Sequence, residues 1–453
     1  MTAKSAQPSN ARRVYVETYG CQMNLADSEL IGGILKSHGY TFTGELTDAD
    51  VVLLNTCAIR ENAEQRIRGR LGLVSARKRS NPNLVVGVLG CMAERLREQL
   101  VEEEQLVDLL VGPDEYRKLP HLLSSAFEGE KGIAVRLSRV ETYDDIEPLR
   151  TDGVSAWLAV MRGCDKFCTF CVVPFTRGRE RSRSQASILR EVETLAEQGF
   201  KEITLLGQNV NSYRDGDTDF ASLMAAVAAV DRSVRIRFTT SHPQDMSDEL
   251  IGTIAATENI CKYIHLPVQS GSDRMLSLMN RTYTAEQYLA LINKIRCAIP
   301  GVSLTTDIIS GFPTETEADH RMTVALMREV RYDGAYTFMY SARERTRAWE
   351  MGDDVPEDVK SARVTEIVEM QQYISREVNL QLVGTVVPVL VEGPSKKSPA
   401  AFTGRTDTNK TVVFPHGREQ AGETVRMTIE RVNSATLFGR PVVAAQQTEG
   451  AAA

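Results

Sequence analysis

The stretch Gly163-Cys164-Asp165-Lys166-Phe167-Cys168-Thr169-Phe170-Cys171 places three thiols within eight residues. It directly follows the apolar run Ala156–Met161, which predicts a β-strand. Active sites of α/β barrels lie at the carboxyl ends of their strands, so this position indicates chemistry. Thiolates suit iron–sulfur clusters or zinc, and three of them leave one metal position open for a ligand.

Two alternatives for these thiols remain open from the residues alone. A structural zinc site would recruit a fourth ligand nearby, but the sequence from Gly153 to Arg190 contains no histidine and no fourth cysteine. A redox dithiol at Cys168-Thr169-Phe170-Cys171 would leave Cys164 without a role. We therefore expect an iron–sulfur cluster with one iron free for a ligand.

Strand and helix patterns alternate on both sides of this stretch. Between Arg13 and Phe127 the alternation predicts a doubly wound parallel sheet covered by helices. The predicted strands there are Val14–Thr18, Val51–Asn55, Leu84–Leu89 and Val107–Val111, and the predicted helices are Ala26–Ser37, Glu61–Arg79, Met92–Glu103 and Pro113–Ala126. Around and beyond the cysteines, six strands with crossovers predict a partial α/β barrel, short of the closed eight-stranded form. These strands are Ala156–Met161, Glu202–Leu206, Arg235–Thr239, Tyr263–Leu266, Ser303–Ile309 and Gly334–Met339.

The carboxyl-terminal region changes its pattern after one long charged helix, Glu357–Leu382. The β-rich runs that follow predict a small all-β barrel. Its predicted strands are Val386–Glu392, Thr411–Pro415, Thr424–Val432 and Thr436–Val443. We therefore expect three domains, at residues 12–130, 150–382 and 383–446, with a charged linker, Arg136–Asp152, joining the first two.

Three further cysteines follow predicted strands of the amino-terminal domain. Cys21, Cys57 and Cys91 stand just past the ends of the first, second and third strand patterns. Because the carboxyl ends of parallel strands share one rim of the sheet, these thiols could converge on a second metal centre. The alternative is three small buried residues, since free cysteine packs readily into cores. Three such placements in a row favour the metal centre.

Composition limits the partners. The 453 residues carry a formal net charge of −7, so any contact with nucleic acid must come from local basic patches. No apolar run reaches the ~18 residues needed to span a bilayer, and Met1–Arg13 lacks a signal-peptide core. We expect a cytoplasmic protein that makes no membrane contact.

The cysteine motifs carry a family resemblance. The CxxxCxxC spacing, with Phe170 before the last cysteine, resembles the signature of the radical S-adenosylmethionine (SAM) superfamily. Within it the chain is similar to the MiaB-type tRNA methylthiotransferases, from Arg13 to about Val443. The motifs that carry this similarity are Thr18-Tyr19-Gly20-Cys21-Gln22-Met23-Asn24, Asn55-Thr56-Cys57-Ala58-Ile59-Arg60 and Leu206-Gly207-Gln208-Asn209-Val210-Asn211.

The resemblance implies the cofactors and the reaction. One 4Fe-4S cluster is expected on Cys164, Cys168 and Cys171, where SAM would yield a 5′-deoxyadenosyl radical. A second, auxiliary 4Fe-4S cluster is expected on the amino-terminal cysteines, and two SAM are used per product. The implied substrate is tRNA carrying N6-isopentenyladenosine at position 37, which becomes the 2-methylthio derivative. A reducing electron donor and a monomeric state are also expected, and the carboxyl-terminal barrel resembles the TRAM domain.

Two other functions remain open. A sister methylthiotransferase would act on threonylcarbamoyladenosine or on an aspartate of a ribosomal protein. A protein of another class, a non-catalytic iron–sulfur RNA-binding or electron-transfer protein, would hold clusters without SAM cleavage.

Further site residues are expected at the carboxyl ends of the barrel strands, where a barrel holds its ligand. The predicted cofactor-binding residues are Phe170, Gln208, Asn209, Thr239, Ser241, Gln269 and Asp307. His242 and His265 are expected to make structural hydrogen bonds. Arginines alternate past the cysteine loop, and an extended segment would place them on one face toward tRNA phosphates. These predicted RNA-binding residues are Arg177, Arg179, Arg181 and Arg183.

One position departs from the family pattern. Arg345 stands where the family usually has a glycine, in the segment Arg343-Glu344-Arg345-Thr346-Arg347-Ala348. We expect a strained left-handed residue there if the turn is retained.

Overall fold

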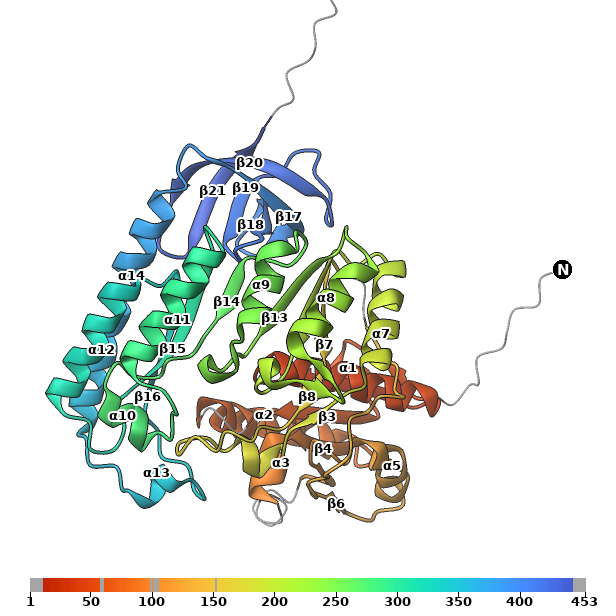
Figure 1. The fold of residues 1–453 in the computed structure, drawn as a ribbon. Helices are drawn as coiled ribbons and strands as arrows, with labels where there is room; N and C mark the ends of the chain where they lie inside the picture. Colours follow the sequence, from red (N-terminus) through yellow and green to blue (C-terminus); the bar gives the residue numbers. More distant parts are fainter. Residues whose placement is uncertain (1–10, 58–60, 98–99, 101–105, 151–152, 443–453) are drawn as a thin grey trace, which may run out of the picture.

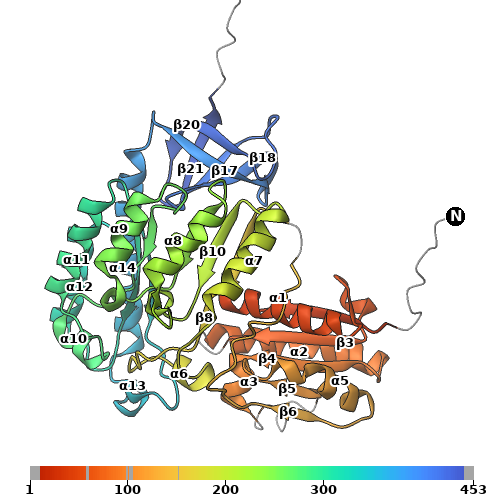
Figure 2. The same cartoon turned by 45° about the vertical axis from the view of Figure 1, so that its right-hand side comes forward.

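Three structural units follow one another along the chain (Figure 1). The computed structural model describes residues 11–57, 61–97, 100, 106–150 and 153–442. An amino-terminal α/β domain lies against one side of a partial barrel, and a small β-barrel caps one end of that partial barrel (Figure 2). The multidomain fold class predicted from the sequence is confirmed.

The amino-terminal domain is built on a six-stranded parallel sheet in the order β2-β1-β3-β4-β5-β6. Its strands are β1 (Arg13–Thr18), β2 (Thr41–Phe42), β3 (Val51–Thr56), β4 (Val85–Gly90), β5 (Leu109–Val111) and β6 (Gly132–Ala134). Its helices are α1 (Gln22–Ser37), α2 (Glu61–Ser80), α3 (Cys91–Leu96) and α5 (Leu119–Phe127). Every residue of β3 and β4 is buried, because helices cover both faces of the sheet.

The sequence patterns located the long elements of this domain better than the short ones. The strands β2 and β6 were not predicted, since two or three residues show no alternation. The predicted helix Met92–Glu103 is observed as the shorter α3, with part of the remainder outside the described residues. The predicted helix Pro113–Ala126 begins only at Leu119, after the 3-10 turn Tyr116–Lys118.

The central unit is a partial barrel of six parallel strands. They form two three-stranded sheets, and the bridge between Ile236 and Ile260 joins these sheets. The strands are β7 (Ser155–Ala159), β10 (Glu202–Leu206), β13 (Arg235–Thr239), β14 (Tyr263–His265), β15 (Ser303–Ser310) and β16 (Gly334–Met339). The crossover helices are α7 (Gln185–Glu197), α8 (Phe220–Val230), α9 (Asp248–Ala256), α11 (Ala285–Ala298) and α12 (Glu317–Val330). Shorter elements are β8 (Met161–Arg162), α6 (Val173–Thr176), β9 (Arg181–Ser182), β11 (Arg214–Asp215), β12 (Thr218–Asp219), α10 (Asp273–Leu278) and α13 (Arg347–Glu350).

A long helix, α14 (Glu357–Leu380), runs along the partial barrel and leads into the carboxyl-terminal unit (Figure 1). That unit is a closed five-stranded barrel in the order β17-β18-β19-β21-β20. Its strands are β17 (Val386–Ser395), β18 (Ser398–Thr406), β19 (Thr411–Pro415), β20 (Thr424–Val432) and β21 (Thr436–Pro441). Only β18 was not predicted, because small and polar residues interrupt its apolar pattern.

The carboxyl-terminal barrel docks on the amino ends of the central strands. At the start of β13, Arg235 donates a hydrogen bond of 2.9 Å to the carbonyl of Arg405. Arg237 donates at 2.7 Å to the carbonyl of Asp407 and forms a buried ion pair of 2.8 Å with Glu202. The turn after β18 therefore closes the base of the partial barrel, opposite the rim that carries the cysteine loop.

The expected linker Arg136–Asp152 has no helix or strand in its described part, but it is packed against the amino-terminal domain. Tyr143 is buried and its hydroxyl donates a hydrogen bond of 3.0 Å to the carbonyl of Pro113. The amide of Leu149 donates at 2.8 Å to the carbonyl of Glu29 on α1. The segment is thus part of the domain surface rather than a free tether. In the described part of the chain, every helix is too short or too polar to cross a membrane.

The contact between this segment and α1 can be tested with a pair of matched substitutions. A methyl group at Gly33 would lie 2.0 Å from the carbonyl oxygen of Glu147, so Gly33→Ala should destabilise the chain by ~1–3 kcal/mol through overpacking. Gly72 in α2 has nothing within 4 Å of the added carbon, so Gly72→Ala should stabilise it by up to about 1 kcal/mol. In thermal unfolding, Gly33→Ala should melt at a lower temperature than the parent chain and Gly72→Ala at a higher one. A Gly33→Ala chain as stable as the parent would show that the segment does not pack on α1.

Candidate functional site

The cysteine loop Gly163–Cys171 lies between β8 and α6, past the carboxyl end of β7. Gly163 has φ +75°, and a Cβ there would lie 2.0 Å from the carbonyl oxygen of Arg179. The amide of Cys164 donates a hydrogen bond of 3.1 Å to the carbonyl of Gly178. Only glycine permits this close return of the chain, which folds the loop back on the arginine-rich segment after α6.

The thiols of this loop lie close enough to influence one another electrostatically. The amide of Cys171 donates at 2.9 Å to the carbonyl of Cys168, which closes a tight turn. The pKa of Cys164 and that of Cys171 are raised to about 12, chiefly by burial and in part by neighbouring thiols of the triad. Without a cation these groups are neutral, so a bound metal would displace protons and gain three thiolate ligands.

A buried arginine that the sequence patterns did not single out stands beside this triad. Arg281 directs Nη1 at 3.4 Å to the sulfur of Cys168. Its other nitrogens donate to the carbonyl of Pro267 at 2.6 Å and to the hydroxyl of Tyr283 at 2.8 Å. The guanidinium is therefore held in place and offers positive charge to a thiolate.

The amino-terminal cysteines converge as their strand ends predicted. Cys21 precedes α1, Cys57 follows β3 and Cys91 opens α3, and the strands before them are neighbours in the sheet. At Gly20, which has φ +132°, a Cβ would lie 2.6 Å from the Cβ of Cys57. Burial raises the pKa of Cys91, and the nearby Cys21 adds to that rise.

The spacing of these groups bears on which metal they suit. Among the described residues, no three histidine, cysteine, aspartate or glutamate side chains are close enough to share a single metal ion. In a 4Fe-4S cluster each thiolate binds a different iron, so its ligands stand farther apart than those of one zinc ion. This spacing is compatible with a 4Fe-4S cluster at either triad. The assignment of clusters to these six cysteines stays a prediction.

A buried charge network joins the central unit to the amino-terminal cysteine site. Asp27 on α1 is fully buried and accepts ion pairs of 2.7 Å from Arg162 and 2.8 Å from Arg177. Burial opposes ionisation of this carboxyl, but the charges of Arg177 and Arg162 hold its pKa below the ordinary value. Arg177 also donates from Nε to the sulfur of Cys91 at 3.1 Å. The central unit thus reaches into the amino-terminal cysteine site.

This network corrects the prediction that four alternating arginines face RNA. Arg177 and Arg181 are buried, the second in an ion pair of 2.8 Å with Asp114. Arg183 is also buried and pairs with Glu191 at 2.6 Å. The segment curls between the domains instead of extending along the surface, so these three charges hold protein carboxylates. Arg179 alone of the four is exposed, and it pairs with Asp165.

Two predicted cofactor residues carry buried polar atoms that lack a partner in the described part of the chain. They are the Oδ1 atom of Asn209, after β10, and the hydroxyl of Ser241, after β13. The amide nitrogen of Asn209 donates at 2.7 Å to Asp245, which pairs with Lys166 of the cysteine loop at 2.8 Å. Unsatisfied buried polar atoms beside the open side of a metal site fit the polar groups of a ligand such as SAM.

The other predicted cofactor residues are distributed around the rim. Gln269 is buried with φ +74°, and its carbonyl accepts a hydrogen bond from Ile309. Phe170 packs against the small core cluster around Met275 and Phe312. Gln208 is half-buried in the turn after β10. Thr239 and Asp307 line a cavity inside the barrel.

That cavity, of about 470 Å³, fills the lumen of the partial barrel and has walls from all three units. Asp307 meets His265 at 3.4 Å within it. The amino-terminal domain contributes Gln22, and the carboxyl-terminal barrel contributes Arg405. The remaining lining residues are Ser155, Trp157, Glu202, Thr204, Arg237, Phe238, Thr239, Thr240, Tyr263, Tyr336, Phe338, Glu392 and Asn409.

Two smaller expectations also have outcomes. The ring of His242 accepts a hydrogen bond of 3.3 Å from the amide of Gln244, and burial together with Arg281 lowers its pKa to about 2. His242 is thus neutral and structural, as expected. Arg345 keeps the left-handed turn, with φ +70°. Its segment supports the cysteine loop, because the amide of Ala348 donates at 3.0 Å to the carbonyl of Thr169.

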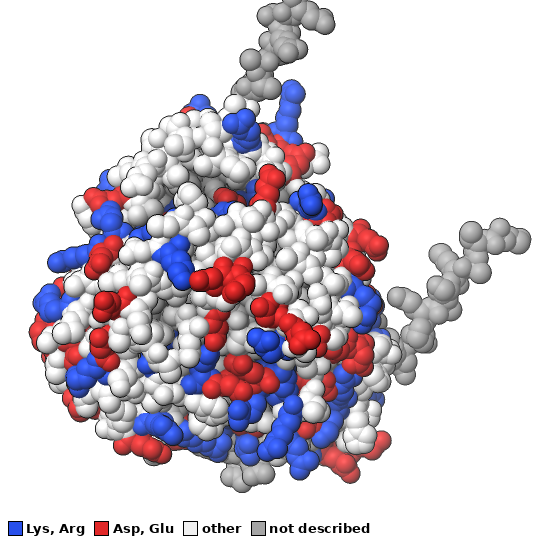
Figure 3. Space-filling model, viewed as in Figure 1, with Lys and Arg blue, Asp and Glu red and all other residues white. Residues whose placement is uncertain are grey.

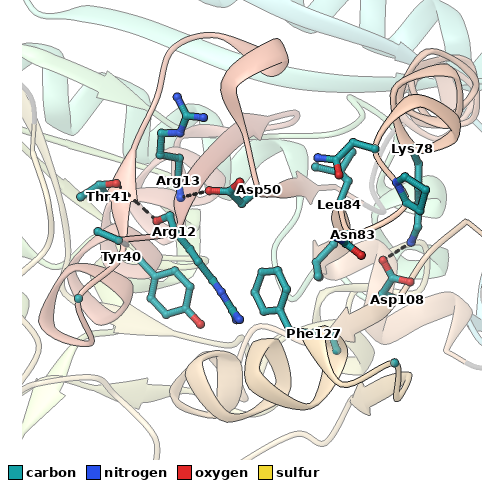
Figure 4. Close-up of a pocket in the computed structure, with 17 residues that line it drawn as sticks. Arg12, Arg13, Tyr40, Thr41, Asp50, Lys78, Asn83, Leu84, Asp108 and Phe127 are labelled. Carbon is teal, nitrogen blue, oxygen red and sulfur yellow. Dashed lines mark hydrogen bonds and ion pairs between the residues drawn. The ribbon is translucent and has the colours of Figure 1, made fainter. Parts of the chain in front are cut away.

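A cavity of about 1300 Å³ lies elsewhere, at the amino ends of the strands of the first sheet (Figure 4). Arg12 stacks over the ring of Phe127, with 3.3 Å from its Cζ to the ring centroid, and Lys78 pairs with Asp108 on the facing wall. Its described lining contains none of the six cysteines. The cavity is therefore separate from the cysteine sites.

Comparisons with known families divide the chain as its fold does. Residues 13–112 match the uncharacterized protein family UPF0004, residues 158–327 match the radical SAM superfamily, and residues 380–442 match the TRAM domain. The fold is similar to that of the radical S-adenosylmethionine methyltransferase TsrM from Kitasatospora setae, with a TM-score of 0.58, 16% identity and 75% of each chain covered. That likeness concerns the fold alone.

Relatives at much higher identity share one name. The tRNA-2-methylthio-N(6)-dimethylallyladenosine synthase of Chloroherpeton thalassium is 56% identical over 430 residues, which cover 94% of this chain and 95% of the relative. The protein of the same name from Amoebophilus asiaticus is 51% identical over 451 residues, which cover 95% and 93%. The resemblance predicted from the cysteine motifs is confirmed, and this chain belongs to the tRNA-2-methylthio-N(6)-dimethylallyladenosine synthase family of the radical SAM superfamily.

Proposed function

We propose that this chain adds a methylthio group to carbon 2 of N6-isopentenyladenosine at tRNA position 37. The family membership supports the reaction class, and its relatives are named for this product. The observation that carries the proposal is a buried contact between the segment that follows the barrel cysteine loop and the amino-terminal triad. Arg177, which follows the barrel cysteine loop, contacts Cys91 of the amino-terminal triad. A radical site and a sulfur-supplying site would thus stand within one active centre.

The described residues fit the expected cofactors. Cys164, Cys168 and Cys171 would hold a 4Fe-4S cluster with an open iron, and the unsatisfied atoms of Asn209 and Ser241 would receive polar groups of SAM. When bound, the two clusters and SAM supply a 5′-deoxyadenosyl radical and the sulfur to be transferred. The chain supplies thiolates, orientation and shelter from water.

The barrel cavity is proposed as the site of the acceptor base. Its volume of about 470 Å³ lies within the range of small-molecule sites, and aromatic side chains of Trp157 and Tyr336 line it. Proteins recognise single-stranded RNA bases by stacking on such rings and by hydrogen bonds to base edges. Thr239 and Asp307 place polar atoms at the rim that the cysteine loop shares.

The carboxyl-terminal barrel is proposed to hold tRNA by shape and backbone contacts. It matches the TRAM domain and carries eight basic against five acidic residues between Gly384 and Arg440. On the face seen in Figure 3, basic and acidic side chains are interspersed. Binding would therefore rest on several local contacts, with Arg179 as the exposed arginine of the cysteine-loop segment.

The remaining partners follow from the reaction class. We propose that a reducing electron donor feeds the barrel cluster, that the chain works as a monomer, and that it acts on tRNA in the cytoplasm. The described residues contain no helix long and apolar enough to cross a membrane.

Nucleoside composition of tRNA tests the acceptor. Deletion of the gene should remove 2-methylthio-N6-isopentenyladenosine from bulk tRNA and leave its unmodified precursor, as measured by chromatography with mass spectrometry. Complementation with the parent chain should restore the product, whereas complementation with Cys164→Ala should not. Persistence of the product in the deletion strain would exclude the proposal. Loss of a methylthiolated threonylcarbamoyladenosine instead would favour the sister activity.

Iron content and SAM cleavage test the two triads. The reconstituted chain should hold about eight irons, as two 4Fe-4S clusters require. Changing Cys21, Cys57 and Cys91 to Ala should halve the iron but leave reductant-dependent release of 5′-deoxyadenosine from SAM. Changing Cys164, Cys168 and Cys171 to Ala should halve the iron and abolish that release.

Each outcome of this experiment separates two explanations. Unchanged iron after removal of Cys21, Cys57 and Cys91 would refute the auxiliary site. A parent chain that holds iron but never cleaves SAM would favour a non-catalytic iron–sulfur protein.

A further inference from the structure

Arg177 lies where the central unit meets the amino-terminal cysteine site, in the segment that follows the barrel cysteine loop. It directly follows α6, six residues after Cys171, so it belongs to the central unit. Its side chain is buried, and its Nε donates a hydrogen bond of 3.1 Å to the sulfur of Cys91 in the amino-terminal domain. The segment that follows the barrel cysteine loop thus contacts the auxiliary triad through one side chain.

The orientation of this guanidinium is tightly determined. Its Nη2 forms an ion pair of 2.8 Å with Asp27 and lies 3.3 Å from Oδ1 of Asn24. The same Oδ1 atom accepts a contact of 3.5 Å from the thiol of Cys21. Arg177 therefore touches one auxiliary cysteine directly and is linked to a second through one side chain.

The third nitrogen of the guanidinium, Nη1, gives the stronger indication that a ligand binds here. Nη1 of Arg177 is buried and has no hydrogen-bond partner in the described part of the chain. A buried donor without an acceptor costs about 1–3 kcal/mol, so a ligand that supplies an acceptor here would be stabilised. Sulfur atoms of a cluster held by Cys21, Cys57 and Cys91 would provide that acceptor.

The balance of buried charges also indicates an anionic group at this site. The network contains two arginines, Arg162 and Arg177, and one carboxylate, Asp27. The adjacent Arg181 has its own carboxylate in Asp114. One positive charge is therefore left over in a buried site, and anionic thiolates or cluster sulfurs would compensate it.

We propose that Arg177 is a positioning residue that donates hydrogen bonds to sulfur atoms of the auxiliary cluster and raises its reduction potential. This inference rests on the proposed placement of that cluster on Cys21, Cys57 and Cys91. Hydrogen bonds and positive charge at cluster sulfurs favour the reduced, more negative form, so they shift the potential upward. The contact also ties Cys91 to the barrel, which fixes the auxiliary site relative to the radical site.

The arginine at the other triad differs in this respect. Arg281 reaches Cys168 at the longer distance of 3.4 Å, and its Nε and Nη2 are bonded to protein acceptors. No nitrogen of Arg281 is among the unpartnered buried atoms of the described residues. Of these two arginines, only Arg177 keeps a buried donor without a partner in the described residues.

The test measures the auxiliary cluster alone. In a chain with Cys164, Cys168 and Cys171 changed to Ala, the remaining iron and its reduction potential belong to the auxiliary site. Arg177→Gln, Arg177→Lys and the control Arg179→Gln are added to this background. Arg179 is an exposed arginine in the same segment, and its charge is paired with Asp165. Reconstituted iron and the midpoint potential, followed by electron paramagnetic resonance in a redox titration, are the readouts.

We expect Arg177→Gln to keep about four irons and to move the midpoint to a more negative value, since the cluster loses a charged donor. Arg177→Lys, which retains the charge but not the planar set of donors, should shift it less. Arg179→Gln should leave the midpoint at the parent value. If Arg177→Gln does not fold, the midpoint potential of Arg177→Lys tests the inference instead, and a more negative value supports it.

Two results would overturn the inference in distinguishable ways. If folded, iron-loaded Arg177 variants have the same midpoint potential as the chain that keeps Arg177, the residue does not act on the cluster. Absence of iron from the background chain itself would refute both the inference and the proposed auxiliary site.

Discussion

The buried carboxylate of Asp27 is the interaction on which the arrangement of the active centre depends. It belongs to the amino-terminal domain, while both of its cationic partners, Arg162 and Arg177, belong to the central unit. Removing one partner from a buried ion pair leaves a charge uncompensated, which costs several kcal/mol, so the two units are held in one relative position. Cys91 accepts a hydrogen bond from the same Arg177, so the relative position of the two units also fixes the auxiliary triad relative to the barrel.

Strand polarity explains why the chemistry gathers where it does. In both α/β units the cysteines follow the carboxyl ends of parallel strands, where chain crossovers leave room for ligands. The carboxyl-terminal barrel takes the other end, where Arg235 and Arg237 donate to its backbone carbonyls. A partial barrel that is closed at its base and flanked at its side encloses the lumen cavity, so an acceptor base would be sheltered from water.

The site also departs from ordinary packing in a consistent way. Buried polar atoms are normally satisfied, yet Asn209, Ser241 and Arg177 each keep one atom without a partner in the described residues. Asn209 is linked to the barrel cysteine loop through Asp245 and Lys166, and Arg177 is bonded to Cys91 of the amino-terminal triad. The left-handed backbone conformation of Arg345 adds local strain, in a segment that supports the cysteine loop. A ligand or cluster bound at these positions would offset part of this cost.

Hydrophobic periodicity and short motifs are local properties, so the sequence alone was enough to predict the three-unit architecture, most of the strands and the position of the six cysteines after strand ends. It also indicated that Cys21, Cys57 and Cys91 share a rim, since parallel strands impose this. The sequence did not predict the partners of the arginines after the cysteine loop. Their alternation predicted an RNA-facing row, but three are buried against Asp27, Asp114 and Glu191. Carboxylates far away in the chain decide the partners of those arginines, so only the tertiary structure, which brings the two domains together, could determine what each arginine does.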